Sequence, residues 1–244
     1  MLAVITGSGA LPLATDGEPV AVPALRYGPP SGVPLRVEVD GTPVLLLARH
    51  GVPHRVPPHR VNYRANVEAL ARLGATRVIA LNTVGGIAPE AWTGRLVVPH
   101  QLVDYTWGRA HTFVEEGDDP VLHVDFGEPF HAGLRHALVD AGVALGIDVG
   151  VSGVYGCTQG PRFETAAEIE RMARDGCSLV GMTGMPEAGL ARERGLPYAM
   201  LSLVVNPAAG RAHDPFNLAV IGQVIASGMT QVEQLLREFI RRAR

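Results

Sequence analysis

Residues 78–86 read Val78-Ile79-Ala80-Leu81-Asn82-Thr83-Val84-Gly85-Gly86, an apolar run that ends in polar residues and glycines. A short run of this kind, bounded by glycines, is typical of a buried β-strand. Comparable runs alternate along the chain with patterns that favour helices. This alternation predicts an α/β domain built around a central sheet.

The expected elements can be placed by residue number. Strands are expected at Leu2–Thr6, Val44–Ala48, Arg77–Asn82, Leu96–Val103, Asp148–Tyr155, Ser178–Met182 and Tyr198–Val205. Helices are expected at Asn62–Leu73, Pro129–Ala141, Thr165–Arg174, Glu187–Arg194 and Leu218–Arg242. Four helix patterns are followed by a glycine, the usual left-handed cap, at Gly74, Gly142, Gly176 and Gly195. Because no repeat or domain linker interrupts the pattern, one domain is expected over residues 1–244.

The composition narrows the classes of partner. The chain has 244 residues, is 47% hydrophobic and carries a formal net charge of −3. This charge gives no basis for nucleic acid or membrane binding, so small molecules or proteins are the expected partners. Cys157 and Cys177 lack metal-ligand spacing, and residues 1–7 show no signal-peptide pattern. Since no apolar run reaches the length of a spanning helix either, a cytoplasmic location is expected.

The chain contains no lysine, and all 21 of its basic residues are arginines. A Walker A loop needs a lysine on the phosphates, and Schiff-base chemistry needs a lysine amine. Both mechanisms are therefore excluded. Any bound phosphate must be held by arginine, histidine, hydroxyl groups and backbone N–H groups.

Groups suited to an anion follow several of the expected strands. Ser8 lies between two glycines after the first strand, Arg49 and His50 follow the second, and Asn82 and Thr83 end the third. Thr183 occupies the same place after the strand Ser178–Met182. Ligands of α/β sheets collect at the carboxyl ends of strands, so these ends together predict a phosphate pocket. Taken singly, each has a structural alternative, such as a plain glycine turn or a hydrogen-bonded core residue.

The stretch Gly160-Pro161-Arg162-Phe163-Glu164-Thr165-Ala166-Ala167-Glu168 places an aromatic ring beside a carboxylate at the start of a helix. Phe163 can stack on a heterocycle, Glu164 can accept from a ring N–H, and the amide of Asn206 can both donate and accept. This combination suits a 6-oxopurine. The alternative interpretation of the stretch is an ordinary helix start, with Thr165 and Glu168 forming a capping box.

Five blocks in the chain together resemble the purine nucleoside phosphorylase and methylthioadenosine phosphorylase family. They are Gly7-Ser8-Gly9, Ala48-Arg49-His50-Gly51 with Val61-Asn62-Tyr63-Arg64-Ala65-Asn66, Asn82-Thr83-Val84-Gly85-Gly86, Gly160-Pro161-Arg162-Phe163-Glu164-Thr165, and Met182-Thr183-Gly184-Met185-Pro186-Glu187. The resemblance implies an αβα sandwich on a mixed sheet and phosphorolysis of a purine N-glycosidic bond. It also implies a homotrimer with shared active sites and no metal or organic cofactor, inorganic phosphate being a co-substrate.

The same resemblance implies a role for individual residues. The implied phosphate ligands are Ser8, Arg49, His50, Asn82, Thr83 and Thr183. The implied substrate contacts are Phe163, Glu164, Met182, Asn206, Pro207 and Ala208, with His123 reaching into the neighbouring subunit's ribose pocket. Among all of these, the expected catalytic residues are Asn206, Glu164 and His50.

Two departures within the family favour one substrate. Adenine-cleaving members are expected to carry acidic residues where this chain has Asn206 and Ala208, so a 6-oxopurine is favoured. A mismatched buried donor or acceptor costs about 1–3 kcal/mol, enough for a ten- to hundredfold preference. Residues 216–221, which include Leu218 and Val220, are mostly apolar and suit a 5′-methylthio group better than a hydroxyl, unless His213 supplies a polar contact.

The sequence leaves other functions open. Within the family, the chain could act on inosine and guanosine in general, or on methylthioadenosine. A hydrolytic nucleosidase would differ in not requiring phosphate. A purine-nucleoside sensor would bind without cleaving, although a sensor has no need of the Arg49, His50 and Thr183 phosphate set.

Overall fold

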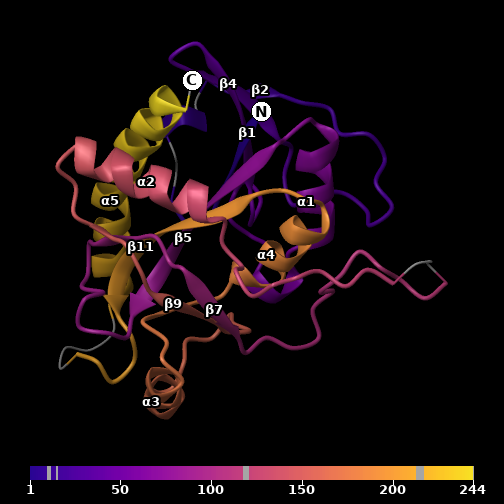
Figure 1. Ribbon diagram of the computed structural model, residues 1–244. Helices are drawn as coiled ribbons and strands as arrows, with labels where there is room; N and C mark the ends of the chain where they lie inside the picture. The colour runs from indigo at the N-terminus through magenta and orange to yellow at the C-terminus, as the bar shows by residue number, and fades with distance from the viewer. Residues whose placement is uncertain (10–11, 15, 118–120, 213–216, 244) are drawn as a thin grey trace.

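The computed structural model describes residues 1–9, 12–14, 16–117, 121–212 and 217–243 (Figure 1). Within these residues the strands are β1 Leu2–Thr6, β2 Glu18–Pro19, β3 Leu35–Val39, β4 Thr42–Ala48, β5 Arg77–Gly86, β6 Leu96–Val97, β7 Gln101–Asp104, β8 Val149–Gly150, β9 Val154–Cys157, β10 Leu179–Gly181 and β11 Tyr198–Pro207. The α-helices are α1 Tyr63–Arg72, α2 Ala132–Ala144, α3 Ala166–Arg174, α4 Gly184–Glu193 and α5 Leu218–Arg242, and short 3₁₀ turns lie at Pro12–Ala14 and Pro58–Arg60.

All of these strands belong to one mixed sheet. Its main path runs β2-β3-β4-β1-β5-β10-β9-β7, and a branch leaves β5 through β11 and β6 to β8. Strand β5, the stretch quoted at the outset, pairs in parallel with β1 and β11 and antiparallel with β10. The central sheet predicted from the sequence is therefore confirmed, with β5 as the strand on which it branches.

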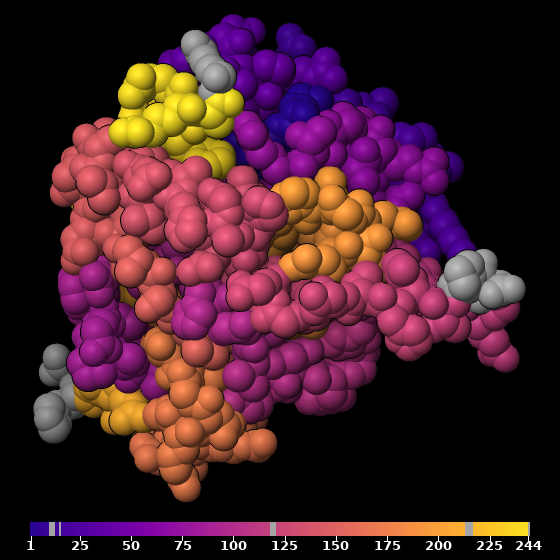
Figure 2. Space-filling model, in the orientation of Figure 1, coloured from indigo at the N-terminus to yellow at the C-terminus, as the bar shows by residue number. Residues whose placement is uncertain are grey.

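Helices cover both faces of the sheet. Leu2 and Val4 of β1 pack with α2 and α5, whereas Ala3 and Ile5 pack with α1 and α4. Side chains alternate across a strand, so a strand buried on both faces has a continuous apolar sequence. Figure 1 shows the two helix layers, and Figure 2 shows α2 and the end of α5 on the outer surface of their face. The predicted αβα sandwich is confirmed.

Two predicted strands are wrong in extent because each is interrupted. Leu96–Val103 forms β6 and β7 with a break that contains Pro99, a residue that cannot donate a backbone hydrogen bond. Asp148–Tyr155 forms β8 and β9 with a break at residues 151–153. Strands β2 and β3 were not predicted. The first has only two residues, and β3 (Leu35–Val39), which lies between β2 and β4, alternates apolar and charged residues.

The prediction that Gly142 caps a helix is wrong, since α2 continues to Ala144. A Cβ atom at Gly142 would lie 2.4 Å from Cγ2 of Val149 on β8. This glycine thus permits a close approach between helix and sheet rather than a left-handed turn. Gly146, with φ of +66°, follows the helix instead.

Two irregularities at the end of the sheet shape one cavity. Because β10 runs antiparallel to the end of β5, the residues that follow Gly181 turn back alongside the middle of β5. The register of β11 against β5 shifts between Val204 and Asn206. A bulge of this kind changes the face to which the following side chain points.

None of the described helices is both long and apolar enough to cross a membrane.

Candidate active site

A cavity of about 1240 Å³ opens where the ends of β1, β4, β10 and β11 meet the carboxyl half of β5. Among the residues predicted for the site, those that line it are Ser8, Arg49, His50, Asn82, Thr83, Phe163, Glu164, Met182, Thr183, Asn206, Pro207, Ala208, Leu218 and Val220. Segments that are distant in the sequence therefore form the walls of one space. His123 is not among its lining residues.

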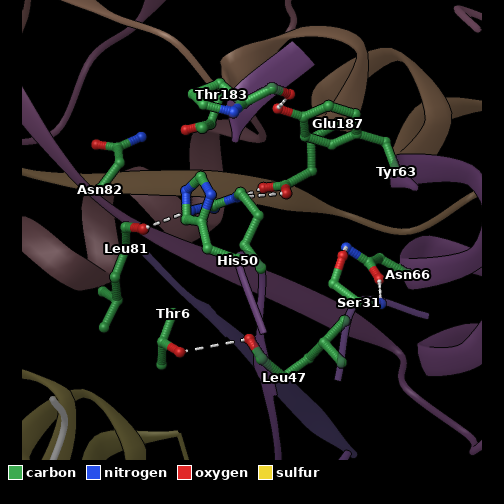
Figure 3. Close-up of polar contacts among 12 residues, drawn as sticks. Thr6, Ser31, Leu47, His50, Tyr63, Asn66, Leu81, Asn82, Thr183 and Glu187 are labelled. Carbon is green, nitrogen blue, oxygen red and sulfur yellow. Dashed lines mark hydrogen bonds and ion pairs between the residues drawn. The ribbon is translucent and has the colours of Figure 1, made fainter. Parts of the chain in front are cut away.

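Arg49 is completely buried beneath this cavity. Its Nε and Nη2 atoms donate to the two carboxylate oxygens of Glu187 at 2.7 and 2.8 Å, and Nη1 donates to the carbonyl of Leu81 at 3.0 Å (Figure 3). Burial opposes the charge of the guanidinium, but the attraction of Glu187 outweighs it and raises the pKa of Arg49. A guanidinium has more N–H donors than these three bonds use, so Arg49 can still donate to an anion.

Glu187, which the sequence-based prediction missed, is the counterion of this arginine. It is completely buried on α4 and also accepts a hydrogen bond of 2.8 Å from the hydroxyl of Tyr198. The signal available in the sequence was an arginine directly after a buried strand, where a buried guanidinium requires a carboxylate partner. Many carboxylates could have supplied it, and only the structure shows which one does.

His50 has a fixed tautomer. Its Nδ1 lies 2.7 Å from the carbonyl of Val56, so Nδ1 carries the proton, and in the neutral ring Nε2 is an acceptor. Burial and the neighbouring charge of Arg49 lower the pKa of His50 to about 4. The ring of His54 stacks on it, with 4.2 Å between centroids. His50 is therefore a neutral group at physiological pH.

Hydroxyl and amide groups complete this half of the cavity. Thr183 begins α4 without using its side chain as a cap, although serine and threonine commonly cap helices in this way. The Oδ1 atom of Asn82 is buried and has no hydrogen-bond partner within the described structure. Figure 3 shows Thr183, Asn82 and His50 around the same space. Together with Ser8 and Arg49, these groups line this half with hydroxyl and guanidinium donors and with acceptors at His50 and Asn82, a combination that suits an oxyanion carrying a proton.

The other half of the cavity carries an aromatic ring, a carboxylate and an amide. Phe163 is 51% exposed, and Glu164 accepts a hydrogen bond of 2.6 Å from the hydroxyl of Thr158, which holds that carboxylate in place. Asn206 follows the bulge in β11, and its Nδ2 donates to the carbonyl of Pro207 at 2.6 Å. The capping box of Thr165 and Glu168 is confirmed, and it begins α3 directly after Phe163 and Glu164.

The first turns of α5 form an apolar part of the wall. Leu218, Val220, Ile221 and Ile225 line the cavity there. Asn217 caps the helix, since its Oδ1 accepts from the backbone N–H groups of Ala219 and Val220. His213 and Phe216, which the sequence analysis also considered at this position, lie outside the described residues.

His123 lies on an exposed segment. The residues on either side of 118–120 project away from the sheet (Figures 1 and 2). Val121 and Leu122 beside it are 64% and 48% exposed. The side chain of His123 is likewise exposed, so in an isolated chain it does not contribute to the cavity described here.

Comparison with known proteins assigns a family to this arrangement. Residues 2–241 match the family described as the Phosphorylase superfamily. The chain belongs to the phosphorylase superfamily.

Relatives in this superfamily cover most of the chain. A probable S-methyl-5′-thioinosine phosphorylase of Pseudomonas syringae pv. tomato is 54% identical over 210 residues, which are 86% of this chain and 85% of the relative. A 6-oxopurine nucleoside phosphorylase of Pyrococcus furiosus is 42% identical over 86% of this chain and 80% of its own length. The methylthioadenosine phosphorylase of Schistosoma mansoni, solved with adenine, superposes with a TM-score of 0.92 at 30% identity, covering 99% of this chain and 91% of that one. The fold of this phosphorylase-superfamily chain is thereby shown independently of the sequence argument.

The buried neutral state of His50 predicts a pH dependence of stability. Its pKa of about 4 lies below the ordinary 6.5, so between these values the unfolded chain binds more protons than the native one. Unfolding free energy should therefore fall as the pH is lowered, by about 1–2 kcal/mol between pH 6.5 and 5 from this residue alone. Urea unfolding at several pH values measures it, and His50→Asn should remove that part of the slope. An equal slope in wild type and variant would contradict the assignment.

Proposed function

We propose that the chain catalyses phosphorolysis of S-methyl-5′-thioinosine to hypoxanthine and 5-methylthioribose 1-phosphate. The observation that carries the proposal is the single cavity in which an oxyanion-binding half faces a purine-binding half. Relatives whose names include this activity or the broader 6-oxopurine nucleoside phosphorylase activity are 38–55% identical to the chain.

In the proposed reaction, hydrogen phosphate is bound beneath C1′ of the ribose. Arg49, the hydroxyls of Ser8, Thr83 and Thr183, and backbone N–H groups donate to it. Because His50 offers an acceptor at Nε2, it suits the oxygen of hydrogen phosphate that carries a proton. An oxygen of the phosphate bonds to C1′ while the bond from C1′ to the purine nitrogen breaks. The bound anion stabilises the positive charge that develops on the sugar.

The purine-binding half supplies stabilisation of the leaving group. Phe163 stacks on the base, Glu164 accepts from a ring N–H, and Asn206 donates to the base as negative charge builds on it. That last contact is stronger in the transition state than in the ground state, so it increases kcat. Asn206 with Ala208, in place of acidic residues, supports a 6-oxopurine rather than adenine.

The apolar start of α5 favours a substrate with a methylthio group at its 5′ position. Leu218 and Val220 contribute surface on which a thioether can be buried, whereas a hydroxyl there would lose hydrogen bonds to water. We further infer a homotrimer in which His123 completes the ribose site of a neighbouring subunit. The exposed segment that bears His123 and its apolar neighbours Val121 and Leu122 supports this arrangement.

The test is release of hypoxanthine from S-methyl-5′-thioinosine, with and without phosphate. Turnover that requires phosphate and exceeds that of inosine and methylthioadenosine is expected. Equal or faster turnover of inosine would indicate a general 6-oxopurine phosphorylase, and faster turnover of methylthioadenosine would overturn the base assignment. Turnover without phosphate would indicate a hydrolase, and binding without turnover a sensor.

The same assay tests the apolar wall through Val220→Ser. This variant should lower the ratio of kcat/KM for methylthioinosine to that for inosine by three- to tenfold, since it removes apolar contact and adds a hydrogen-bonding group. Val143→Ser on α2, a residue that is 72% exposed and does not line the cavity, is the matched control and should leave the ratio unchanged. An unchanged ratio in Val220→Ser would place the 5′ group elsewhere.

A further inference from the structure

Arg109 is a partly buried arginine to which the proposed reaction assigns no role. It lies on the segment that follows β7. Its Nε donates to the side-chain oxygen of Gln159 at 3.1 Å, and its Nη2 donates to the carbonyls of Thr158 and Gln159 at 3.2 and 2.8 Å. One side of the guanidinium is therefore bonded to the loop that follows β9.

The other side of the same guanidinium is bonded to a second part of the site. Nη1 donates to the carbonyl of Met182 at 3.0 Å, to the carbonyl of Met185, and to the hydroxyl of Tyr63 at 3.3 Å. Met182 lies in the turn between β10 and α4, and Met185 lies in the first turn of α4, where its dihedral angles are non-helical. None of the acceptors on either side is a carboxylate, so Arg109 bonds to two loops and α1 through uncharged oxygens.

Each of these two loops carries a different half of the cavity. On the first, the hydroxyl of Thr158 donates to Glu164 at 2.6 Å, so the backbone that Arg109 holds also holds the carboxylate proposed to bind the purine. On the second, Met182 directly precedes Thr183, whose hydroxyl is proposed to bind phosphate.

From this geometry we infer that Arg109 is a positioning residue that holds the purine-binding loop and the phosphate-binding loop at a fixed separation. This inference rests on the proposed function, because the separation matters where a nucleophile on one side must reach a carbon held on the other. Reactions of this kind lose rate steeply when bound groups shift by about 1 Å. Arg109 does not touch either substrate in this inference; it acts through the two loops.

The inference predicts that loss of Arg109 lowers turnover more than binding. In Arg109→Met, kcat should fall at least thirtyfold, while the dissociation constants of phosphate alone and of nucleoside alone, measured by calorimetry, stay within about threefold of wild type. Arg109→Lys keeps the charge, but the single ammonium group cannot reach the acceptors of both loops as the planar guanidinium does. An intermediate loss of kcat is therefore expected.

The matched control is Arg64→Met. Arg64, on α1, forms an ion pair of 2.7 Å with Glu115, which lies on the same segment as Arg109. Arg64 does not line the cavity. Its kcat should remain within twofold of wild type. If Arg109→Met fails to fold, Arg109→Lys is combined with Thr158→Val, and the two effects on kcat should be coupled by at least threefold because both act on the same loop.

A readout independent of catalysis separates this inference from the proposed function. Amide hydrogen exchange should accelerate in residues 158–164 and 182–186 together in Arg109→Lys, and in neither segment in Arg64→Met. This result can be obtained whichever nucleoside the enzyme prefers. The inference would be overturned by unchanged exchange in either segment of Arg109→Lys. It would also be overturned if kcat of Arg109→Met stayed within threefold of wild type, or if weaker substrate binding fully explained the loss of activity in that variant.

Discussion

Glu187→Gln is expected to destabilise the protein by about 3–5 kcal/mol, because it leaves Arg49 as a buried charge without its counterion. Both side chains are completely buried, and their two hydrogen bonds are 2.7 and 2.8 Å long. The amide of glutamine can still accept from the guanidinium but no longer neutralises it. Urea unfolding at neutral pH measures the change, and phosphate KM should rise in the protein that remains folded, since the orientation of Arg49 is lost.

The control for this prediction is Glu68→Gln. Glu68 is also buried, and it accepts from Arg72 at 2.9 Å and forms an ion pair with Arg194 at 2.6 Å, but the side chains of these arginines are 55% and 33% exposed, so water solvates their charges. Its loss should cost at most about 1 kcal/mol. The double variant Arg49→Met with Glu187→Leu should recover stability but not phosphorolysis, because it replaces the ion pair by apolar groups and removes the proposed phosphate ligand. Equal losses of unfolding free energy in Glu187→Gln and Glu68→Gln would show that the buried Arg49–Glu187 pair does not stabilise the protein more than the pairs of Glu68.

Asn206→Ala is expected to lower kcat/KM for the nucleoside ten- to a hundredfold while leaving phosphate KM nearly unchanged. The reason is the position of Asn206 at the bulge of β11, among the lining residues proposed to bind the purine rather than phosphate. Removing a donor to the departing base costs about 1–3 kcal/mol in the transition state. Initial rates with each substrate varied at saturating concentrations of the other separate the two effects.

A second variant at this position tests the base assignment. Asn206→Asp has nearly the same shape but replaces a donor by an acceptor, so the ratio of 6-oxopurine to adenine nucleoside turnover should fall at least tenfold. A loss confined to phosphate KM in Asn206→Ala, or an unaltered ratio in Asn206→Asp, would place the purine in another part of the cavity.

Local features of the structure were predicted well from the sequence. The capping box of Thr165 and Glu168 depends only on residues three apart, and the structure contains it. The break between β6 and β7 was missed because the apolar residues Val97-Val98 and Leu102-Val103 make the run look continuous across the intervening Pro99, His100 and Gln101. Helix α4 begins at Gly184 rather than at Glu187, and its first turn is interrupted at Met185, which has non-helical dihedral angles.

In the candidate site, too, some residues were predicted from the sequence and others were missed. Arg49 and His50 were predicted because a cation and an imidazole directly after a buried strand are difficult to explain as core residues. The sequence analysis missed Glu187, Arg109 and His54. Each of them belongs to the site only through a contact with another segment of the folded chain, with Arg49, Met182 and His50 respectively. The partner of Arg49 is 138 residues away in the sequence, and no local pattern specifies such a pairing.

By itself, the sequence determined the layered α/β architecture, because continuous apolar runs such as residues 78–81 must be covered on both faces. It also determined the available chemistry, which includes arginine and histidine but no lysine. Only the tertiary structure decided that β10 runs antiparallel to β5, that β11 bulges before Asn206, and that Glu187 neutralises Arg49. Strand direction, register and buried ion pairing depend on the packing of distant segments, and local preferences do not specify them.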